Sequence, residues 1–398
     1  MEILDFFSTT WYGGLLLMIF CSYVIAKACD VFEAATDYLG RNMSDGVKGA
    51  TLNAIGSSMP ELLTTAFFLA FASTANLGRD LAASIGGDTG SAIFNSIVIP
   101  MLVIWIVIAT VAGVKGLKVA KKVILRDGLF LLGAEVLLLV LLSSDYITHW
   151  HGWAFTVFYL VYLGYTLMSM KCNDVKAEER EEEAPDTWYE KFLLKAEGGR
   201  TGRSWILLGI SMLVIAAACA GLVEGCKGIA DSLGINPLFI ALILIAAASS
   251  VPDTIISIKD AKKGNYDDAL SNVLGSNIFD ITISMGLPLA IFLMLTGEKI
   301  DFRVAGPTLI DIRIMLLLIT VVTIGVFYFA KDLRKRHVGL LGVLYAFFIV
   351  YSIGAATYHA DGEGMMAQQA GKFIEYLHQP GGLTESLQEF ANYITGNW

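Results

Sequence analysis

Charged side chains are scarce in this sequence. Of its 398 residues, 28 are Lys or Arg and 37 are Asp or Glu, so that 16% of the chain is charged and 55% is hydrophobic. A soluble domain carries about 25% charged residues, and the composition therefore excludes an ordinary water-soluble protein. Uncharged runs of about 18 apolar residues, enough to cross about 30 Å of hydrocarbon, recur along the chain. The lipid bilayer is the main predicted partner, and nothing in the composition points to nucleic acid.

These apolar runs lack the alternation of apolar and polar residues that a membrane β-barrel would have. In lipid, such segments satisfy their backbone groups only as helices. We therefore predict an all-α polytopic membrane protein with ten transmembrane helices. The predicted spans are residues 11–29, 46–73, 84–114, 124–144, 150–170, 204–231, 237–260, 268–296, 310–330 and 338–357.

Cysteine and an N-terminal positive charge are also scarce. Five cysteines, four of them in the first and sixth spans, form no disulfide framework and no CxxC metal motif. We expect them to act as small packing residues. The first residues include Glu2 and Asp5 but no Lys or Arg, unlike a cleaved signal peptide, so we expect the first span to be retained.

Basic residues are distributed unevenly between alternate connections. The connections between spans 1–2, 3–4, 5–6, 7–8 and 9–10 hold 22 of the 28 Lys and Arg residues. Because basic residues are retained on the cytoplasmic side, we predict that these connections are cytoplasmic. Both termini are then expected outside.

The longest polar connection divides the spans into two groups of five. Its nine acidic and seven basic residues nearly cancel, which indicates a solvated linker, with a regulatory or helical role as the alternative. The tail after the last span fits two short amphipathic helices. The predicted division is a first repeat at 1–170, a cytoplasmic linker at 171–203, a second repeat at 204–357 and an extracytoplasmic tail at 358–398.

Two motifs occur once in each group of spans. Gly56–Glu61 (GSSMPE) matches Ala248–Asp253 (ASSVPD) 192 residues later, and Gly90–Asn95 (GSAIFN) matches Gly275–Asp280 (GSNIFD) 185 residues later. An odd number of spans in each group reverses the polarity of the second group, so the repeat is inverted. Transporters built in this way place their substrate site near the bilayer midplane.

Three acids of these motifs lie within predicted spans. Glu61, Asp253 and Asp280 each have hydroxyl neighbours, and Asn95 takes the fourth repeat-related position. An ionised carboxylate in hydrocarbon costs several kcal/mol unless it is paired, so such acids indicate function. Carboxylate, amide, hydroxyl and carbonyl oxygens are the ligands of hard cations such as Ca2+ and Na+.

Two prolines add backbone carbonyls to this set. A proline inside a helix lacks the N–H that would bond the carbonyl four residues earlier, which here predicts free carbonyls at Gly56 and Ala248. Serines of membrane helices also pack or bond back to their own helix, and each serine keeps that alternative. The predicted metal-site residues are Glu61, Asp253, Asp280, Asn95, Ser57, Ser58, Ser249, Ser250, Ser91, Ser276, Gly56 and Ala248.

Other acids and the histidines are weaker candidates. Asp88 lies two turns before Asn95, where it could line an access path; Glu135 and Glu224 have no repeat partner, and pairing with Lys227 would account for Glu224. Interfacial positions explain the histidines better than metal binding does. The histidines are His149, His151, His337, His359 and His378.

At these motifs the sequence resembles the calcium/cation antiporter superfamily, whose inverted repeats carry a G-[ST]-S-x-P-E type motif followed by G-S-x-x-x-[ND]. It is most similar to the potassium-dependent sodium/calcium exchangers. The resemblance implies that Glu61 and Asp253 are central Ca2+ ligands shared with Na+, and that Asp280 occupies a position associated with K+. The long regulatory loop of animal members is missing, which suggests a prokaryotic form in the inner membrane.

The implied function is secondary antiport of Ca2+ against Na+, with K+ co-transport left open and with no enzyme activity or bound cofactor. Three close carboxylates cannot all stay ionised at low dielectric without cations. Exchange follows if the site can switch from one side of the membrane to the other only when bound ions neutralise this charge. A Ca2+/H+ antiporter using the same residues and a passive cation channel are the alternatives. An intramembrane aspartyl protease is disfavoured, since Ile85–Asp88 lacks the first Gly of a Gly-x-Gly-Asp motif.

Overall fold

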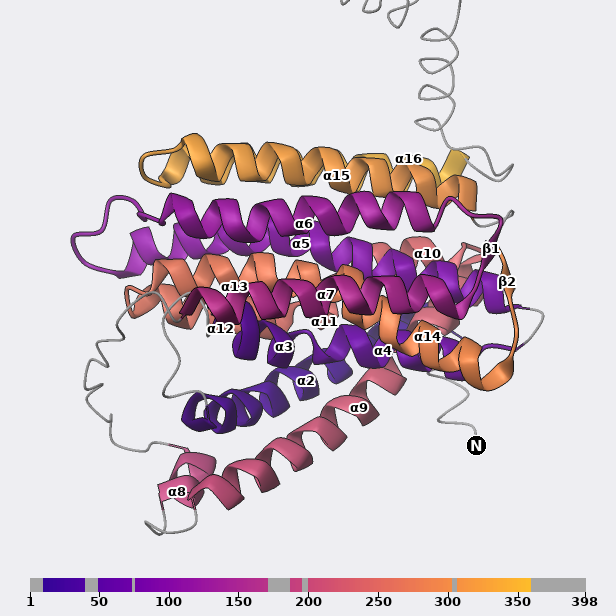
Figure 1. The fold of residues 1–398 in the computed structure, drawn as a ribbon, viewed down its shortest axis with the longest axis horizontal. Helices are drawn as coiled ribbons and strands as arrows, with labels where there is room; N and C mark the ends of the chain where they lie inside the picture. Colours follow the sequence, from indigo (N-terminus) through magenta and orange to yellow (C-terminus); the bar gives the residue numbers. More distant parts are fainter. Residues whose placement is uncertain are drawn as a thin grey trace, which may run out of the picture.

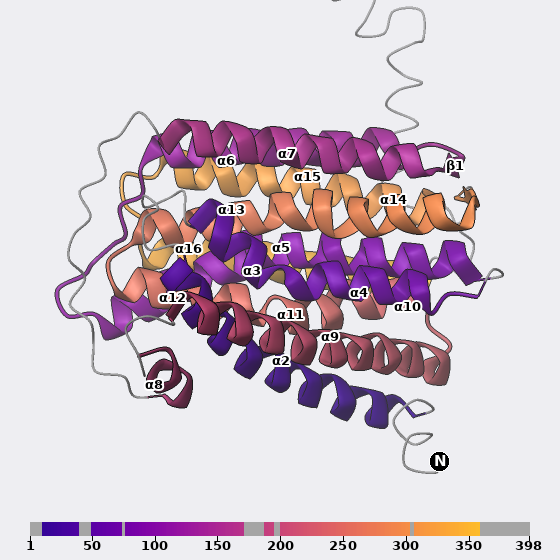
Figure 2. The same cartoon turned by 60° about the horizontal axis from the view of Figure 1, so that its bottom comes forward.

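Long helices lie side by side in a bundle (Figures 1 and 2). A computed structural model describes residues 10–39, 49–73, 76–170, 187–194, 200–302 and 306–358. Within these ranges, seven helices are long and apolar enough to cross a membrane, which agrees with the predicted all-α membrane protein. They are Trp11–Thr36, Leu77–Thr110, Thr201–Leu233, Pro237–Lys262, Tyr266–Thr296, Leu309–Phe329 and Lys335–Gly354.

The helices before the predicted linker follow the predicted spans, but the second span is broken into three pieces. They are α2 (Trp11–Leu39), the π-helix η1 (Gly49–Asn53), α3 (Ala54–Ser57), α4 (Met59–Ala70), α5 (Leu77–Thr110), α6 (Lys121–Leu141) and α7 (His149–Met170). Within the linker, α8 covers Trp188–Leu194. The predicted tail lies outside the described residues apart from Tyr358.

The helices after the linker include a segment interrupted like the second span, and also a π-helix, η4 (Asp280–Ser284), where the equivalent α5 is continuous. They are α9 (Arg200–Leu233), α10 (Pro237–Ile240), the π-helix η3 (Ala241–Ile245), α11 (Ala246–Ser249), α12 (Val251–Lys262), α13 (Tyr266–Phe279), η4, α14 (Met285–Thr296), α15 (Gly306–Phe329) and α16 (Lys335–Tyr358). Single π-helical turns within α-helices are frequent at functional sites.

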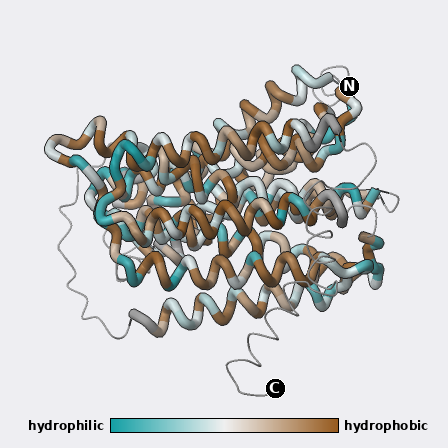
Figure 3. Tube along the Cα trace, turned by 90° about the horizontal axis from the view of Figure 1, so that it is seen from above, coloured by the Kyte–Doolittle hydropathy of each residue, from teal (hydrophilic) through white to brown (hydrophobic). Residues whose placement is uncertain are grey.

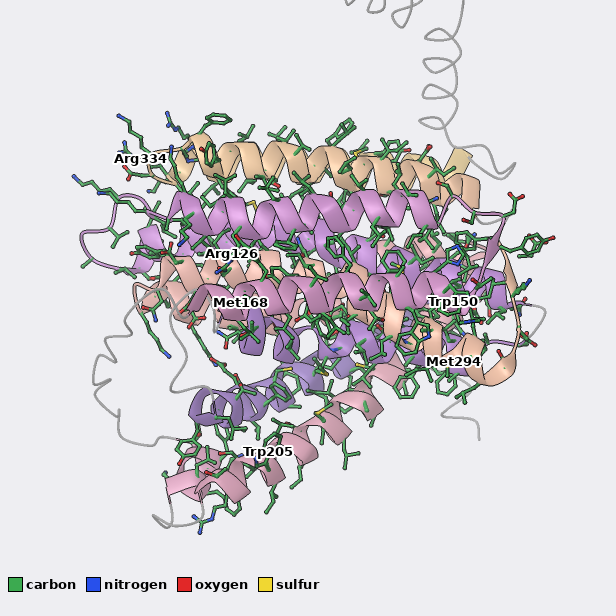
Figure 4. All side chains as sticks on the ribbon, viewed as in Figure 1. Arg126, Trp150, Met168, Trp205, Met294 and Arg334 are labelled. Atoms are coloured by element: carbon green, nitrogen blue, oxygen red, sulfur yellow. The ribbon has the colours of Figure 1, made fainter. Side chains whose placement is uncertain are left out.

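Two short β contacts join loops at opposite ends of the bundle. The two-residue strands β1 (Tyr146–Ile147) and β2 (Ile300–Asp301) pair antiparallel at the end opposite the one where Arg334 is labelled (Figures 1 and 4). A single antiparallel bridge joins Leu117, after α5, to Leu333, after α15. These pairs are the only β structure in the described ranges, so the protein is nearly, rather than entirely, α-helical.

The buried apolar residues of the described ranges form one large cluster, a smaller cluster mainly along α2 and α9, and a third of only three residues, Ala35, Leu193 and Leu207. Four free cysteines are buried in the second cluster, which confirms the predicted packing role for these four; Cys172 lies outside the described residues. The four are Cys21, Cys29, Cys219 and Cys226. Hydrophobic segments run along the helices in Figure 3, and large apolar side chains such as Leu213, Leu295 and Phe329 are exposed on the surface. Such a surface suits contact with lipid.

Candidate cation-binding site

The broken helices carry the two proline motifs. Each bound of η1, α3 and α4 differs by 192 residues from the corresponding bound of η3, α11 and α12. This is the offset at which the motifs repeat in the sequence. The repeated residues therefore adopt the same local structure twice.

The helix breaks lie at Ser58 and Ser250, one residue before α4 and α12. Pro60 and Pro252 lie in the first turns of α4 and α12, directly after these one-residue interruptions. The helical hydrogen bonds resume at once, from Leu62 N to the Ser58 carbonyl and from Thr254 N to the Ser250 carbonyl. In the first turn of a helix the backbone N–H has no carbonyl partner within the helix, so the missing N–H of proline costs nothing there. The fixed φ angle of proline also suits the start of a helix. The carbonyl of Gly56 still has no N–H donor four residues later.

Three of the predicted acids meet inside the bundle. Oxygen atoms of Glu61, Asp253 and Asp280 all lie within 4.8 Å of one another. Their exposed fractions are 1%, 0% and 0%. Glu61 and Asp253 lie in the first turns of α4 and α12, and Asp280 is the first residue of the π-helix η4.

Ser91 of α5 joins the two groups of helices. Its Oγ lies 3.0 Å from Glu61 Oε1, 3.1 Å from Asp280 Oδ2 and 2.8 Å from Ser250 Oγ, so its single proton is shared among these neighbours. One serine thus contacts residues from α4, η4 and the break before α12.

Ser276 of α13 makes the corresponding contact in the second group. Its hydroxyl donates to Asp253 Oδ1 at 2.6 Å and lies 3.3 Å from the hydroxyl of Ser57. Asn95 adds an amide donor, whose Nδ2 lies 3.1 Å from Asp253 Oδ2 and 3.5 Å from Asp280 Oδ2. The pairs Ser91 with Glu61 and Ser276 with Asp253 are related by the repeat.

Two of the predicted serines take the structural alternative. Ser57 donates to the carbonyl of Asn53 at 2.7 Å, and Ser249 donates to the carbonyl of Ile245 at 2.9 Å. Both bonds return to the preceding π-helix of the same segment. These hydroxyl protons are therefore engaged with the helix, whereas the oxygens keep lone pairs that can accept a cation.

The site contains oxygen atoms without hydrogen-bond partners. Among the described residues, these include Ser58 Oγ, Glu61 Oε2, Asn95 Oδ1 and Asp280 Oδ1. A buried polar atom without a partner costs about 1–3 kcal/mol, whereas a hard cation takes six to eight oxygen ligands. The donor set therefore fits Ca2+ or Na+ chemically.

Glycines bring the helices of the two groups into close contact. A Cβ on Gly90 would overlap the Leu242 carbonyl oxygen of η3, and one on Gly275 would lie 3.0 Å from Ala50 Cα of η1. These contacts are again related by the repeat. Gly56 packs directly against the Phe32 ring, which gives it a packing role in addition to the predicted carbonyl ligand.

A polar chain beside the site was not predicted. Ser84 Oγ donates to Thr65 Oγ1 at 2.8 Å, and Thr65 Oγ1 donates to Asp88 Oδ2 at 3.0 Å. Asp88 is 1% exposed. The spacing of Ser84, Asp88, Ser91 and Asn95 along one face of α5 is the sequence signal that could have identified this chain.

The remaining candidates lie elsewhere. Glu135 is buried and accepts a 2.6 Å hydrogen bond from Thr320, away from the three acids. The predicted pairing of Glu224 with Lys227 is wrong, because Lys227 lies 3.1 Å from Asp80 of α5. Three histidines lie near the beginnings of α7 and α16, as predicted for span ends, and the other two lie outside the described residues. The three are His149, His151 and His337.

A family model described as "Sodium/calcium exchanger protein" matches residues 13–168 and 203–354. The chain belongs to this family. It is therefore a membrane transporter of the calcium/cation antiporter superfamily, as the motifs predicted. The two matched segments lie on either side of the charged linker.

Relatives of this exchanger family member include a putative antiporter CaxA of Alkalimonas amylolytica, 29% identical over 282 residues, which are 69% of this chain and 77% of that protein. The inner membrane protein YrbG of Escherichia coli is 26% identical over 64% of this chain and 70% of its own length. Sodium/potassium/calcium exchanger 4 of Homo sapiens is 32% identical over 31% of this chain and 20% of that protein.

Solved exchanger structures share the fold. An H+/Ca2+ exchanger CAX has a TM-score of 0.64 at 13% identity, covering 92% of this chain and 91% of that chain. The sodium-calcium exchanger NCX_Mj has a TM-score of 0.55 at 23% identity, covering 85% and 97%. At these identities the likeness concerns the fold alone.

Proposed function

We propose that the protein exchanges Ca2+ for Na+ across a prokaryotic inner membrane by alternating access to one central site. The observation that carries the proposal is the meeting of Glu61, Asp253 and Asp280, fully buried, with their oxygens within 4.8 Å of one another. Membership of the sodium/calcium exchanger family supports it. Bacterial and archaeal relatives support the prokaryotic location.

Glu61 and Asp253 are the proposed central Ca2+ ligands, because each supplies a carboxylate from a separate group of helices. Asp280 adds a third negative charge. One Ca2+ offsets two of these charges, and a Na+, K+ or proton offsets the third. Ligands completing the site are drawn from Ser57, Ser58, Ser249, Ser250, Ser91, Ser276 and Asn95 and from the carbonyls of Gly56 and Ala248.

The proposed architecture consists of two inverted five-helix repeats, at 1–170 and 204–357. Besides the seven apolar helices, the broken helix from η1 to α4 and the helices α6 and α7 would cross the membrane. The β contacts support the inversion: one joins the loop after α6 to the loop after α14, and the other joins the loop after α15 to the loop after α5. A pseudo-twofold axis that exchanges the repeats would exchange these two contacts.

The proposed orientation places both termini outside. Arg126 and Arg334 lie toward one end of the bundle, whereas Trp150 and Met294 lie toward the other (Figure 4). Since basic residues are retained in the cytoplasm, the end with Arg334 is the proposed cytoplasmic end.

Flux measurements test the coupling ion. Purified protein in proteoliposomes is given a Ca2+ gradient while Na+, K+ and pH gradients are applied one at a time. An outward Na+ gradient is expected to drive Ca2+ uptake, and dependence on added K+ would support a role for Asp280 in K+ binding. Ca2+ uptake that does not depend on the Na+ gradient would overturn the assignment of Na+ as the coupling ion.

Ca2+/H+ antiport is the second candidate. The specific observation that favours it is Asp280, whose Oδ1 has no hydrogen-bond partner and which lies beside two other carboxylates. A proton on such a carboxyl group would supply the missing charge. Uptake driven by a pH gradient without Na+ would identify this mode. Electrical current that needs no counter-ion would instead identify a passive channel.

A further inference from the structure

Two loops at the proposed cytoplasmic end are joined next to a basic surface. Leu117, after α5, and Leu333, after α15, exchange backbone hydrogen bonds of 2.9 and 2.8 Å. Gly116 lies so close to the opposite loop that a Cβ would approach Arg334 Cγ at 3.0 Å. These contacts hold the two loops at a fixed separation.

An open cavity of about 540 Å³ lies beside this junction. Four of its six lining residues are basic, two are apolar and none is acidic. The lining residues are Ile108, Val114, Lys115, Arg334, Lys335 and Arg336. The cavity therefore combines positive charge with an apolar edge.

The positive charge of this surface is only partly neutralised. Arg334 forms a 2.7 Å ion pair with Asp332. The hydrogen bond from Arg334, together with the nearby charges of Lys118 and Lys331, lowers the pKa of the Asp332 carboxyl. This loop therefore has one carboxylate among several cations.

The beginning of α16 has an unfavourable distribution of charge for a free helix. Lys335 and Arg336 are its first two residues, and its first turn contains no acid. The N-terminus of a helix has a positive partial charge and favours anions. By contrast, α13 begins at the same end with Asp267 and Asp268 in its first turn. A bound anion would compensate the charge that α16 leaves uncompensated.

Exposed aromatic residues place the cavity near the lipid headgroups. Trp105 of α5 is 55% exposed, close to the cytoplasmic end of that helix. Lys121 Nζ lies 4.9 Å from the centre of the Tyr328 ring, at the end of α15. Trp and Tyr are enriched at the membrane–water interface, so the cavity beyond them lies at headgroup level.

We propose that this cavity binds the phosphate-bearing headgroup of an anionic phospholipid. Basic pockets between transmembrane helices on the cytoplasmic side are suited to such headgroups. Free phosphate carries the same kind of charge, but it has no apolar group that could contact the edge formed by Ile108 and Val114. The lipid extends from the charged lining into the bilayer beside that edge.

A pair of matched variants tests the proposal. Lys335→Gln with Arg336→Gln removes two charges from the cavity. Lys262→Gln with Lys263→Gln removes two charges from exposed positions at the same end, outside the cavity lining. Each full-length protein is placed in phosphatidylcholine nanodiscs, and binding of added phosphatidylglycerol is measured by native mass spectrometry.

The cavity variant is expected to bind phosphatidylglycerol about 25-fold more weakly than wild type, whereas the control variant stays within about threefold. Equal losses in the two variants would overturn the specific site and leave only general attraction to positive charge. Competition by inorganic phosphate as strong as that by the lipid would identify a free-anion site and contradict the lipid assignment.

A single change in the α5–α6 loop provides a second comparison if the double variant does not fold. Lys115→Gln is expected to weaken phosphatidylglycerol binding about fivefold, whereas Lys115→Arg, which keeps the charge, should bind as wild type. Unchanged binding by Lys115→Gln would contradict the proposal.

Discussion

The two halves of the cation site share a scaffold but differ in charge. In each half a serine hydroxyl donates to the acid of its own proline motif, at 3.0 Å for Glu61 and 2.6 Å for Asp253. Asp253 also accepts a hydrogen bond from the side-chain amide of Asn95. The residue related to Asn95 by the repeat is Asp280, which places a second carboxylate near Glu61. The comparison teaches that the repeat fixes the geometry while single side chains distribute the charge.

The same contrast continues one turn from the centre. Beside the first half, Asp88 accepts a hydrogen bond from Thr65; beside the second half, Asn272 donates to Ser257 at 3.0 Å. Both pairs are buried. The hydroxyls of Thr65 and Ser257 are related by the repeat, whereas Val273 takes the position of Asp88 and Gly87 that of Asn272. A carboxylate therefore lies on one side and an amide on the other, although the two residues are not equivalent. We expect cations to be attracted more strongly along the Asp88 side.

Removing either central acid should have the largest effect. Glu61→Gln and Asp253→Asn are each expected to lower Ca2+ affinity by at least about 100-fold and to abolish Ca2+ flux, because each removes a buried charge that the bound ion needs. Flux in proteoliposomes measures the loss. Glu135→Gln, a change at a buried glutamate away from the cluster, is the matched control and should keep wild-type flux.

Exchanging the charges of Asn95 and Asp280 tests whether the two halves have the same geometry and differ only in charge. Asp280→Asn should weaken Ca2+ binding about tenfold, since Ca2+ affinity follows the number of charged ligands, and should remove any K+ dependence. Adding Asn95→Asp restores the number of carboxylates in the other half and should recover part of the affinity. A double variant that binds no better than Asp280→Asn would show that the halves are not interchangeable. Calcium titration of the purified variants measures both effects.

The glycine contacts offer a test through stability. Gly90→Ala forces a methyl group against the Leu242 carbonyl oxygen, and overpacking of this kind costs about 1–3 kcal/mol or more. Gly275→Ala meets Ala50 at 3.0 Å and should be milder. Thermal unfolding in detergent is expected to rank wild type above Gly275→Ala and Gly275→Ala above Gly90→Ala. The opposite ranking would mean that the two contacts are less alike than the repeat implies.

Asp88→Asn should have the smallest effect. Asp88 lies outside the cluster of three acids, so its charge acts on the bound ion over a longer distance. An approximately threefold rise in the Ca2+ concentration for half-maximal flux is expected, with the maximal flux retained. Asn272→Asp adds a carboxylate beside the second half, and it should lower that concentration. Effects as large as those of Glu61→Gln would make Asp88 a central ligand.

Sequence reasoning located the central residues because their motifs occur twice. In each motif a serine lies four residues before the acid or amide, which predicted that both side chains lie on one face of a helix. The structure brings these faces together. The helix breaks were missed, since Pro60 is compatible both with a kink inside a helix and with the first turn of a new one. The π-helices also have no distinctive sequence pattern.

Contacts between distant helices were the least predictable from sequence. Lys227 pairs with Asp80, 147 residues away, although Glu224 lies only three residues from it. The hydroxyl that donates to Asp88 belongs to Thr65 of α4, 23 residues away, and the repeated motifs do not include Thr65. Pairing of this kind depends on how the helices pack, whereas local spacing describes only one helix at a time.

The most direct test of the central claim is to locate bound Ca2+ crystallographically by its anomalous scattering. The proposal predicts a peak at about 2.3–2.6 Å from carboxylate oxygens of both Glu61 and Asp253. A calcium peak coordinated by only one half of the site, or one elsewhere in the bundle, would contradict it.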